Sequence, residues 1–492
     1  MRILYLDLDT LRPDHLGCYG YHRNTSPNLD WIASQGTRFE NYYCSDAPCL
    51  PSRAALLTGR YGIHNGVINH GGVCADLPPD GVNRSFRDSL AEGGSLFHLL
   101  RAAGLHCAYV GGFGERHSAY WWYAGMHEIM DTGKHGMESA EDVTPTALDW
   151  IRRNAKQDNW YLHVNYWDPH TPYRAPASFG NPFADDPLPA WLTSAVFDGH
   201  RNHVGPHGPL EIAMYDDSTR SQYPRHPGKI TDMDGVRSVI DGYDCGIRHM
   251  DGHIGQLLDA FREAGVLDEL VIIVSSDHGE NLGELGLYGE HGTADQITCR
   301  IPMLVRWPGV AMAGSVDRGL HLSIDLLPTL AETLNRPAKP YWDGQSFAAT
   351  LRDGTDTGRE DAVISQCCHV CQRSVRWGDW LYVRTYHDGY HLLPQEMLFN
   401  IREDPHEQCD LAAERPELCR EGAWRLLRWH DDMMQRMPRG LTSDPMQVVL
   451  DEGGPFHARG ELKAYARRLA ATGREWALPE LQRRHPREFG KA

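Results

Sequence analysis

The chain opens with short apolar runs that alternate with amphipathic stretches. Runs typical of buried strands lie at 3–8, 107–110, 161–164, 271–275 and 303–305. Helical periodicity falls between them, for example at 89–103 and 246–264. Nearly continuous apolar strands separated by helices indicate parallel strands with both sheet faces covered. The pattern therefore predicts an α/β fold built on a large, mostly parallel sheet sandwiched by helices.

The composition and hydrophobic pattern of the sequence change three times along the chain. Pro, Gly, His and Asp dominate 174–240, which we interpret as an insertion or lid within a catalytic domain spanning 1–360. Short alternating runs at 374–383 and 396–401 and a helical stretch at 416–436 predict a smaller α+β subdomain with an antiparallel sheet over 361–440. Residues 441–492 are polar and helix-prone, and we expect them to pack on the body as a tail.

Composition narrows the class of protein. With 492 residues, of which 41% are hydrophobic and 23% charged, the chain is globular and long enough for two or more units of roughly 150 residues. A net charge of −18 disfavours nucleic acid and anionic membranes as partners. No apolar run approaches the ~18 residues of a membrane span. The strand-like opening and the scattered cysteines favour a cytoplasmic protein without a signal peptide.

The strongest chemical signal is the string Cys49-Leu50-Pro51-Ser52-Arg53, followed by Leu57-Thr58-Gly59-Arg60. Proline at an early helical position predicts that a helix begins near Cys49. A helix amino terminus favours negative charge, so Cys49 is a candidate thiolate, metal ligand or anion-binding nucleophile. For an isolated Cys-x-Pro, a half-buried cysteine that only caps the helix is an equally good interpretation.

The complete string resembles the sulfatase signature Cys-x-Pro-Ser-Arg-x-x-x-Leu-Thr-Gly-Arg at every fixed position. The similarity extends from residue 3 to about residue 411 and implies the fold of sulfatases and of the wider alkaline phosphatase superfamily. It further implies that a separate maturation enzyme oxidises Cys49 to formylglycine. The hydrated aldehyde would then attack the sulfur of a sulfate ester beside a divalent metal. Arg53 would hold the hydrate and neutralise the site.

Oxygen and nitrogen ligands follow two of the predicted strands. Asp9 ends the first strand, and Asp277 and His278 end a later one. Carboxylates at strand ends suit a hard divalent ion, Ca²⁺ first and Mg²⁺ or Mn²⁺ as alternatives. Both strings resemble sulfatase metal-binding segments, which implies Asp9, Asp277, His278 and converted Cys49 as ligands. The alternative is that the two aspartates cap turns.

The metal string departs from the family at one position. Many sulfatases have two adjacent aspartates where this chain has Asp9-Thr10. Asp7 shares a strand face with Asp9 through the two-residue period, so it is a candidate substitute ligand. We favour a buried structural role for Asp7.

Further positions are assigned by resemblance to the family's substrate-binding segments. His170, in Asp168-Pro169-His170-Thr171-Pro172, matches a loop whose His contacts the sulfate and protonates the leaving oxygen. The alternative for His170 is a solvated loop residue. Arg116 or His117 stands in for one family Lys, and His291 for another. Asn69 lies where phosphonate monoester hydrolases have an active-site Asn.

Other histidines and aromatic residues gather around the presumed mouth of the site. Cys367-Cys368-His369-Val370-Cys371 has the composition of a soft-metal site, but no second pair accompanies it. We therefore prefer His369 as a substrate-binding residue over a zinc ligand. His200, His203, His207, His387 and His391 are further candidates near the mouth. The aromatic run 120–123 either stacks on substrate or packs in the core.

Together these features predict a sulfuric ester hydrolase that acts on a small sulfated substrate, a sulfated sugar in the first instance. One alternative is a phosphonate monoester or phosphodiester hydrolase on the same scaffold. Another is a non-catalytic relative that binds sulfated glycans, which the two missing lysines favour. The expected partners are the substrate and the maturation enzyme, and a homo-oligomer is left open.

Overall fold

A mixed eight-stranded sheet forms the centre of the protein, whose computed structural model describes residues 1–77, 94–437 and 443–490. The strand order is β11-β2-β10-β7-β1-β6-β4-β5. The strands are β1 (Arg2–Leu8), β2 (Thr37–Tyr43), β4 (His106–Val110), β5 (Glu128–Met130), β6 (Trp160–Tyr166), β7 (Val271–Ser275), β10 (Met303–Arg306) and β11 (Ser315–Leu322). The predicted α/β fold with a large, mostly parallel sheet is confirmed.

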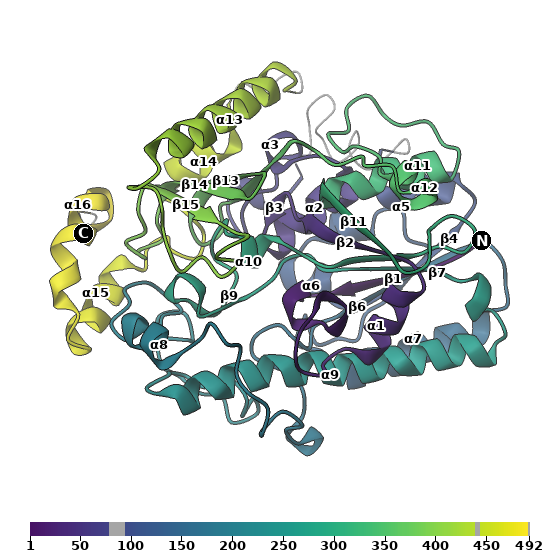
Figure 1. The fold of residues 1–492 in the computed structure, drawn as a ribbon, viewed down its shortest axis with the longest axis horizontal. Helices are drawn as coiled ribbons and strands as arrows, with labels where there is room; N and C mark the ends of the chain where they lie inside the picture. Colours follow the sequence, from purple (N-terminus) through teal and green to yellow (C-terminus); the bar gives the residue numbers. More distant parts are fainter. Residues whose placement is uncertain (78–93, 438–442, 491–492) are drawn as a thin grey trace.

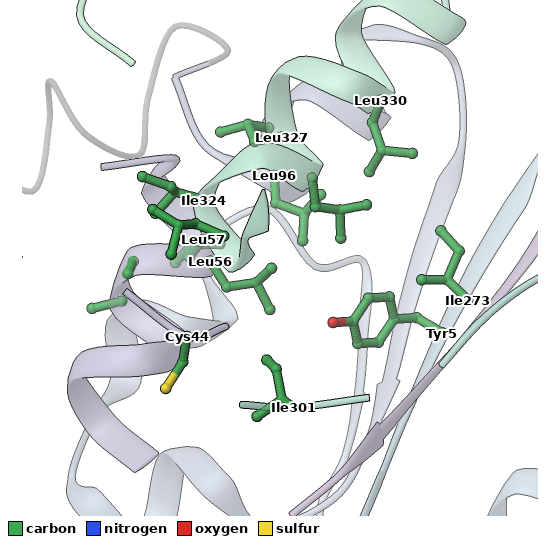
Figure 2. Close-up of a cluster of buried hydrophobic side chains, with 14 of the residues drawn as sticks. Tyr5, Cys44, Leu56, Leu57, Leu96, Ile273, Ile301, Ile324, Leu327 and Leu330 are labelled. Carbon is green, nitrogen blue, oxygen red and sulfur yellow. The ribbon is translucent and has the colours of Figure 1, made fainter. Parts of the chain in front are cut away.

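Helices cover both faces of this sheet (Figure 1). Leu4, Leu6 and Leu8 of β1 pack toward one face, which carries α1 (Pro27–Ser34), α7 (Ala140–Asn154) and α9 (Met233–Glu263). Ile3 and Tyr5 point to the other face, beneath α2 (Cys49–Thr58), α5 (Leu96–Ala102) and α11 (Leu326–Thr333). Figure 2 shows this second layer, where Leu56 and Leu57 of α2 meet Leu327 of α11 above the sheet. By the strand period, Asp7 belongs to the face that α2 covers.

The strand at the predicted range 303–305 is antiparallel, which corrects our expectation of a parallel strand. Met303 of β10 pairs with Ser275 of β7, and Arg306 pairs with Ile272. β7 ends at the edge where β10 begins, because the chain between them stays at that edge in a small hairpin of β8 (Asn281–Leu282) and β9 (Tyr288–Glu290). A parallel strand would need a crossover to the opposite edge. An apolar run alone does not encode strand direction.

The long helix α9 begins thirteen residues before the predicted start at 246, so 233–240 of the predicted insertion is helical. Asp232 caps it by accepting a hydrogen bond from the backbone of Gly235. Its first half buries polar residues, and Arg23 pairs with both Asp241 and Asp244 at 2.8 Å. These buried ion pairs hide the apolar period that sequence reading depends on. The start of the other predicted helix, 89–93, lies outside the described residues, and α5 begins at Leu96.

A second sheet has five strands in the order β15-β14-β13-β12-β3. Its strands are β3 (Asp46–Ala47), β12 (Asp361–Gln366), β13 (Cys371–Trp377), β14 (Trp380–His387) and β15 (Glu396–Asn400). The predicted run 374–383 is two strands joined by a tight turn at Gly378, whose φ is +49°. The helix α13 (Pro416–Gln435) matches the predicted range closely. Because β3 pairs with β12, this sheet continues into the segment just before Cys49.

The final described segment contains α14 (Pro445–Asp451), α15 (Leu462–Ala471), α16 (Leu478–Arg484) and α17 (Pro486–Gly490). α15 contacts the 174–240 segment, where the Tyr465 hydroxyl donates to Glu211 at 2.9 Å. Arg474 pairs with the same carboxylate at 2.6 Å. None of the helices within the described residues has both the length and the apolar character needed to cross a bilayer.

Candidate active site

Cys49 is the first residue of α2, as the sequence predicts. The Ser52 hydroxyl, one turn on, donates to the Asp277 carbonyl oxygen at 2.7 Å and thereby ties this helix to the end of β7. The Cys49 side chain is only 1% exposed, and its Sγ lies 3.0 Å from Nε2 of His278. The helix start and the end of β7 therefore converge on one point.

The environment of Cys49 does not favour its thiolate. Burial raises the pKa of the Cys49 thiol well above its ordinary value, and the carboxylates of Asp9 and Asp277 raise it further. Arg53 opposes this shift only in part. The helix start favours the thiolate of Cys49, but burial and two nearby carboxylates have the larger effect and favour the neutral thiol.

Arg53 is buried among three carboxylates. Its Nε and one terminal nitrogen bind the two oxygens of Asp7 at 3.0 Å each, in a bidentate pair. The same terminal nitrogen lies 3.0 Å from Asp9, and the other contacts Asp277. The ring of Phe113 lies beneath the guanidinium carbon at 4.6 Å. Arg53 therefore neutralises and orients the three carboxylates. Its Nε and both of its terminal nitrogens contact them.

Asp7 is buried and paired as expected for the structural role that we favoured over metal binding. Besides Arg53, its carboxylate contacts Nε2 of His163 at 3.2 Å. Burial alone would raise the pKa of Asp7, but Arg53 and His163 lower it below its ordinary value. Both carboxylate oxygens are engaged in this way, so Asp7 fits a supporting role behind the ligands.

Four predicted ligands come together around one point. The ligand atoms of Asp9, Cys49, Asp277 and His278 lie within 4.8 Å of one another, and all four residues are buried. Burial and the Asp277 carboxylate raise the pKa of Asp9 to about 6, because two carboxylates repel at this separation. One oxygen of Asp9, Oδ2, has no hydrogen-bond donor, although the Arg53 charge lies close. A divalent cation would relieve the repulsion and use that oxygen.

The imidazole of His278 is oriented as a ligand. Its Nδ1 lies 2.8 Å from the Gly279 carbonyl oxygen, which can only accept a hydrogen bond. Nδ1 therefore carries the proton, and Nε2 presents its lone pair toward Cys49 and toward Asp277 at 3.3 Å. This tautomer suits a metal-binding histidine.

Thr10 replaces the second aspartate of the family pattern with a hydrogen-bond donor. Its hydroxyl donates to Asp9 at 2.7 Å, and its backbone N–H donates to Asp277 at 3.1 Å. The backbone of Thr10 is left-handed, with φ of +65°, a region that β-branched residues rarely enter. Thr10 therefore orients both carboxylates without adding a third.

His170 and His291 both reach this centre. Nε2 of His170 lies 4.0 Å from Asp9 and has no hydrogen-bond partner, while its Nδ1 lies 2.5 Å from the Thr171 carbonyl. The His291 ring stacks on His278 with centroids 4.3 Å apart. Burial lowers the pKa of both His170 and His291 well below the ordinary value. Nearby Arg116 lowers the His170 pKa further, so a bound anion is needed to favour its protonated form.

A cavity of about 800 Å³ opens above these groups. Arg116 and His117, both from α6 (Phe113–His117), line it together with His369, from the loop between β12 and β13 of the smaller sheet. Nε2 of His117 has no hydrogen-bond partner. Cys49, although only 1% exposed, forms part of the cavity wall, so the predicted nucleophile faces the cavity.

Asn69 and the aromatic run lie away from the cavity lining. Asn69 is fully buried, and its side-chain oxygen accepts hydrogen bonds from the backbone of His70 at 2.9 Å and Phe456 at 3.3 Å. Its role in substrate binding stays a prediction. Trp121 and Trp122 are buried in the core, which supports the packing interpretation for these two residues, whereas Tyr120 is 63% exposed.

Sequence reasoning missed several residues of the cavity wall. Glu290, His70 and His457 line it, and His457 comes from the C-terminal segment. Glu290 directly precedes the candidate His291 in the sequence, but no local pattern identifies it as a site residue. A single His457 in a polar tail carries no periodic signal at all. Arg174 was also missed; it donates to the carbonyls of Trp167 at 2.7 Å and His170 at 2.6 Å and so shapes the His170 loop.

Comparison with known proteins places this geometry in a family. The sulfatase family profile matches residues 2–335. The chain belongs to the sulfatase family. A choline-sulfatase of Rhizobium meliloti is 25% identical over 439 residues, which cover 79% of this sulfatase and 77% of the relative. An N-acetylglucosamine-6-O-sulfatase of Bacteroides thetaiotaomicron is 22% identical over 479 residues, which cover 82% of this chain and 81% of the relative.

A solved structure supports the fold. The phosphonate monoester hydrolase of Agrobacterium radiobacter superposes with a TM-score of 0.70 at 20% identity. The superposition covers 89% of this chain and 97% of the hydrolase. The fold shared with this hydrolase therefore extends well beyond the segment that the family profile matches.

Proposed function

We propose that this sulfatase-family hydrolase cleaves the sulfate ester of a small sugar, with Cys49 converted to formylglycine and a divalent metal bound beside it. The observation that carries the proposal is the convergence of Cys49, Asp9, Asp277 and His278 within 4.8 Å, beside a cavity that Cys49 lines. Membership of the family supports the same reaction class.

The chain's own residues have distinct roles in this proposal. Asp9, Asp277 and His278 would hold the cation, which supplies Lewis-acid stabilisation of the charge that develops on the sulfate oxygens. Ca²⁺ suits the carboxylate oxygens best, and Mg²⁺ or Mn²⁺ are accepted by the same donor set. Arg53 holds the carboxylates in place through its contacts with Asp7 and Asp9.

Proton transfer falls to the histidines above the metal ligands. Nε2 of His170 faces the centre without a partner, so it is placed to donate a proton to the leaving oxygen. His291, stacked on His278, is placed to contact the sulfate or the leaving group. Arg116, from the wall of the cavity, adds a positive charge for the anion.

Cavity size and lining support a polyhydroxylated substrate. A volume of about 800 Å³ accommodates a sugar ring, and the imidazoles of the wall offer both donors and acceptors to hydroxyl groups. The relative named N-acetylglucosamine-6-O-sulfatase supports this choice. The relative named choline-sulfatase makes a small alkyl sulfate the next substrate to test.

A second candidate is hydrolysis of phosphonate monoesters or phosphodiesters. Such esters present about one negative charge, as a sulfate monoester does, and the same cation and arginines would accept them. The sequence resemblance assigns Arg116 or His117 to the position of one lysine of many sulfatases and His291 to that of another, which supports keeping this candidate.

One experiment separates the candidates. Because Cys49 is 1% exposed, its maturation must precede closure of the fold, so the protein is produced together with a formylglycine-generating enzyme. We expect faster turnover of nitrophenyl sulfate than of a nitrophenyl phenylphosphonate on one metal-loaded preparation, with Cys49→Ala as the inactive control. The reverse preference would favour the phosphonate hydrolase. No turnover of either ester, or of a panel of sugar sulfates, would favour the non-catalytic alternative.

A further inference from the structure

Glu290 is a buried carboxylate surrounded by imidazoles from separate parts of the chain. It ends β9, and its Oε2 contacts Nε2 of His207 from the 174–240 segment. Its Oε1 lies 3.4 Å from Nε2 of His369, in the loop between β12 and β13, and 3.7 Å from Nε2 of His291. Glu290, His207 and His369 are 3%, 7% and 5% exposed, so bulk water screens this group only weakly.

The ring of His207 presents a lone pair to this carboxylate. Its Nδ1 lies 2.8 Å from the Ile212 carbonyl oxygen, an acceptor only, so Nδ1 carries a proton. In the neutral ring, Nε2 is then an acceptor, and it faces another acceptor on Glu290. Two acceptors repel at contact unless a positive charge, a proton or a metal ion, lies between them.

The backbone holds His207 in this orientation. Its φ is +60°, in the left-handed region that residues other than glycine seldom occupy. The backbone N–H of His207 donates to the Met214 carbonyl at 3.0 Å, which fixes the turn. A disfavoured conformation held by surrounding structure is typical of functional positions.

The other two side chains are also fixed in place. Oε1 of Glu290 accepts a hydrogen bond from the backbone of His291 at 2.8 Å. The ring of His457 stacks on His369 with centroids 4.2 Å apart and planes at 19°. A Cβ at Gly292 would lie 3.3 Å from both Glu290 and His369, so glycine permits their close approach. The three donors are therefore assembled before any ligand arrives.

We propose that His207, Glu290 and His369 form a second metal site, for a borderline transition ion such as Zn²⁺, in the wall of the substrate cavity. Their ligand atoms lie within 4.8 Å of one another. Zinc–ligand distances of about 2.0–2.2 Å in a tetrahedron place neighbouring donors roughly 3.3 Å apart, close to the 3.4 Å between His369 and Glu290. His207 and Glu290 are in closer contact, so the His207 ring has to move away from the carboxylate to admit the ion. Two imidazoles and one carboxylate leave a fourth position, on the cavity side, for water or a substrate oxygen.

This site differs in chemistry from the one at Asp9. The Asp9 group offers mainly carboxylate oxygens, whereas two of three donors here are imidazole nitrogens, which favour Zn²⁺ over Ca²⁺. His70, His369 and His457 are also close together, but His70 and His457 hydrogen bond to each other at 2.9 Å and no carboxylate accompanies them. The shared His369 therefore belongs with His207 and Glu290, as a metal ligand in place of the direct substrate contact that the sequence suggested for it.

Calorimetric titration of the full chain with Zn²⁺ tests the proposal. The protein is first stripped with chelator and then saturated with Ca²⁺ to fill the Asp9 site, and conversion of Cys49 is not required. We expect one tightly bound equivalent of Zn²⁺. His207→Ala, His369→Ala and the isosteric Glu290→Gln should each weaken it at least about 10-fold. Co²⁺ in place of Zn²⁺ should give the visible absorption of a tetrahedral centre, and His369→Ala should abolish it.

Matched variants keep the result unambiguous. His200→Ala, from the same segment, should retain the Zn²⁺ equivalent, because His200 bonds to the Tyr288 hydroxyl at 2.9 Å and lies outside the ligand group. Asp277→Asn should also retain it, which separates this site from the one in the proposed function. A rise in Tm on adding Zn²⁺ to the wild type, absent in folded Glu290→Gln, would give the same answer without calorimetry. No Zn²⁺ equivalent in the wild type, or an undiminished one in all three variants, overturns the proposal.

Discussion

The Sγ of Cys49 and the Nε2 of His278 lie 3.0 Å apart, although the two residues are 229 positions apart in the sequence. One begins a helix over the sheet, and the other follows the strand β7. The hydrogen bond from the Ser52 hydroxyl to the Asp277 carbonyl fixes this approach. The side chain of Cys49 is thus held against the residues that we propose as cation ligands, and the predictions below depend on that contact.

Removal of the Asp277 carboxylate is expected to empty the metal site. Asp277 contacts Arg53 and accepts from the Thr10 backbone, so Asp277→Asn leaves the shape nearly unchanged while it removes a negative ligand. We expect loss of bound Ca²⁺ by elemental analysis and a fall in turnover of at least about 100-fold. Asp268→Asn, an exposed carboxylate before the same strand, is the control. Unchanged metal content in Asp277→Asn would exclude it as a ligand.

Restoring the family's second aspartate should increase the dependence of stability on metal. In Thr10→Asp a further carboxylate joins Asp9 and Asp277, and like charges raise the cost of the metal-free state. We expect a lower Tm than wild type in chelator and a larger gain on adding Ca²⁺. Thr10→Ser is the matched control, because it keeps the hydroxyl donor and removes only the β-branch. Equal Ca²⁺-induced shifts in the two variants would contradict the prediction.

Substitution of His170 and substitution of His291 are expected to lower turnover with different dependence on the leaving group of the ester. A general acid matters most when the leaving oxygen is strongly basic. His170→Ala should therefore lower turnover of a sugar sulfate by about 10²–10⁴-fold and affect nitrophenyl sulfate much less. His291→Ala should slow both esters to a similar extent, since His291 packs on the metal-site residue His278. Equal losses on both esters in His170→Ala would show that His170 does not supply the proton.

The C-terminal segment should lose stability as the pH rises. His485 lies 2.8 Å from Asp388 and 3.4 Å from Glu488, and beside His387 and Arg484. Burial alone would lower the pKa of His485, but the two carboxylates raise it to about 9. A raised pKa contributes stability that is fully present below about pH 6.5, the unfolded value, and is lost as the pH approaches 9.

Hydrogen exchange of residues 478–490 measures this effect. Protection in the wild type should decrease between pH 6.5 and 9 after correction for intrinsic exchange. His485→Gln should show a flat profile over that window, because its side chain does not titrate. Parallel profiles for the two proteins would mean that the imidazolium does not stabilise this segment.

The sequence predicted most of the candidate ligands at the strand ends and fewer of the residues that form the cavity wall above them. Asp9 and Asp277 follow apolar runs, and parallel strands bring such residues to one edge. The direction of β10 was wrong in prediction because an apolar run carries no sign of orientation. The early start of α9 was hidden by the buried ion pairs of Arg23.

The cavity wall was harder to predict for a physical reason. Glu290, His70 and His457 come from segments far apart along the chain and meet only through tertiary packing. Each is a single polar residue without periodic neighbours, so no local pattern marks it. The pairing of β3 with β12, which carries His369 toward Cys49, joins strands separated by more than three hundred residues.

The mass of the peptide that contains residue 49, taken from catalytically active protein, tests the central claim most directly. Replacement of the cysteine side chain by an aldehyde lowers the mass by about 18 Da. We expect the fraction of lighter peptide to rise in proportion to sulfate-ester turnover across preparations with and without the maturation enzyme. Full activity in protein whose residue 49 is entirely unmodified cysteine would contradict the account.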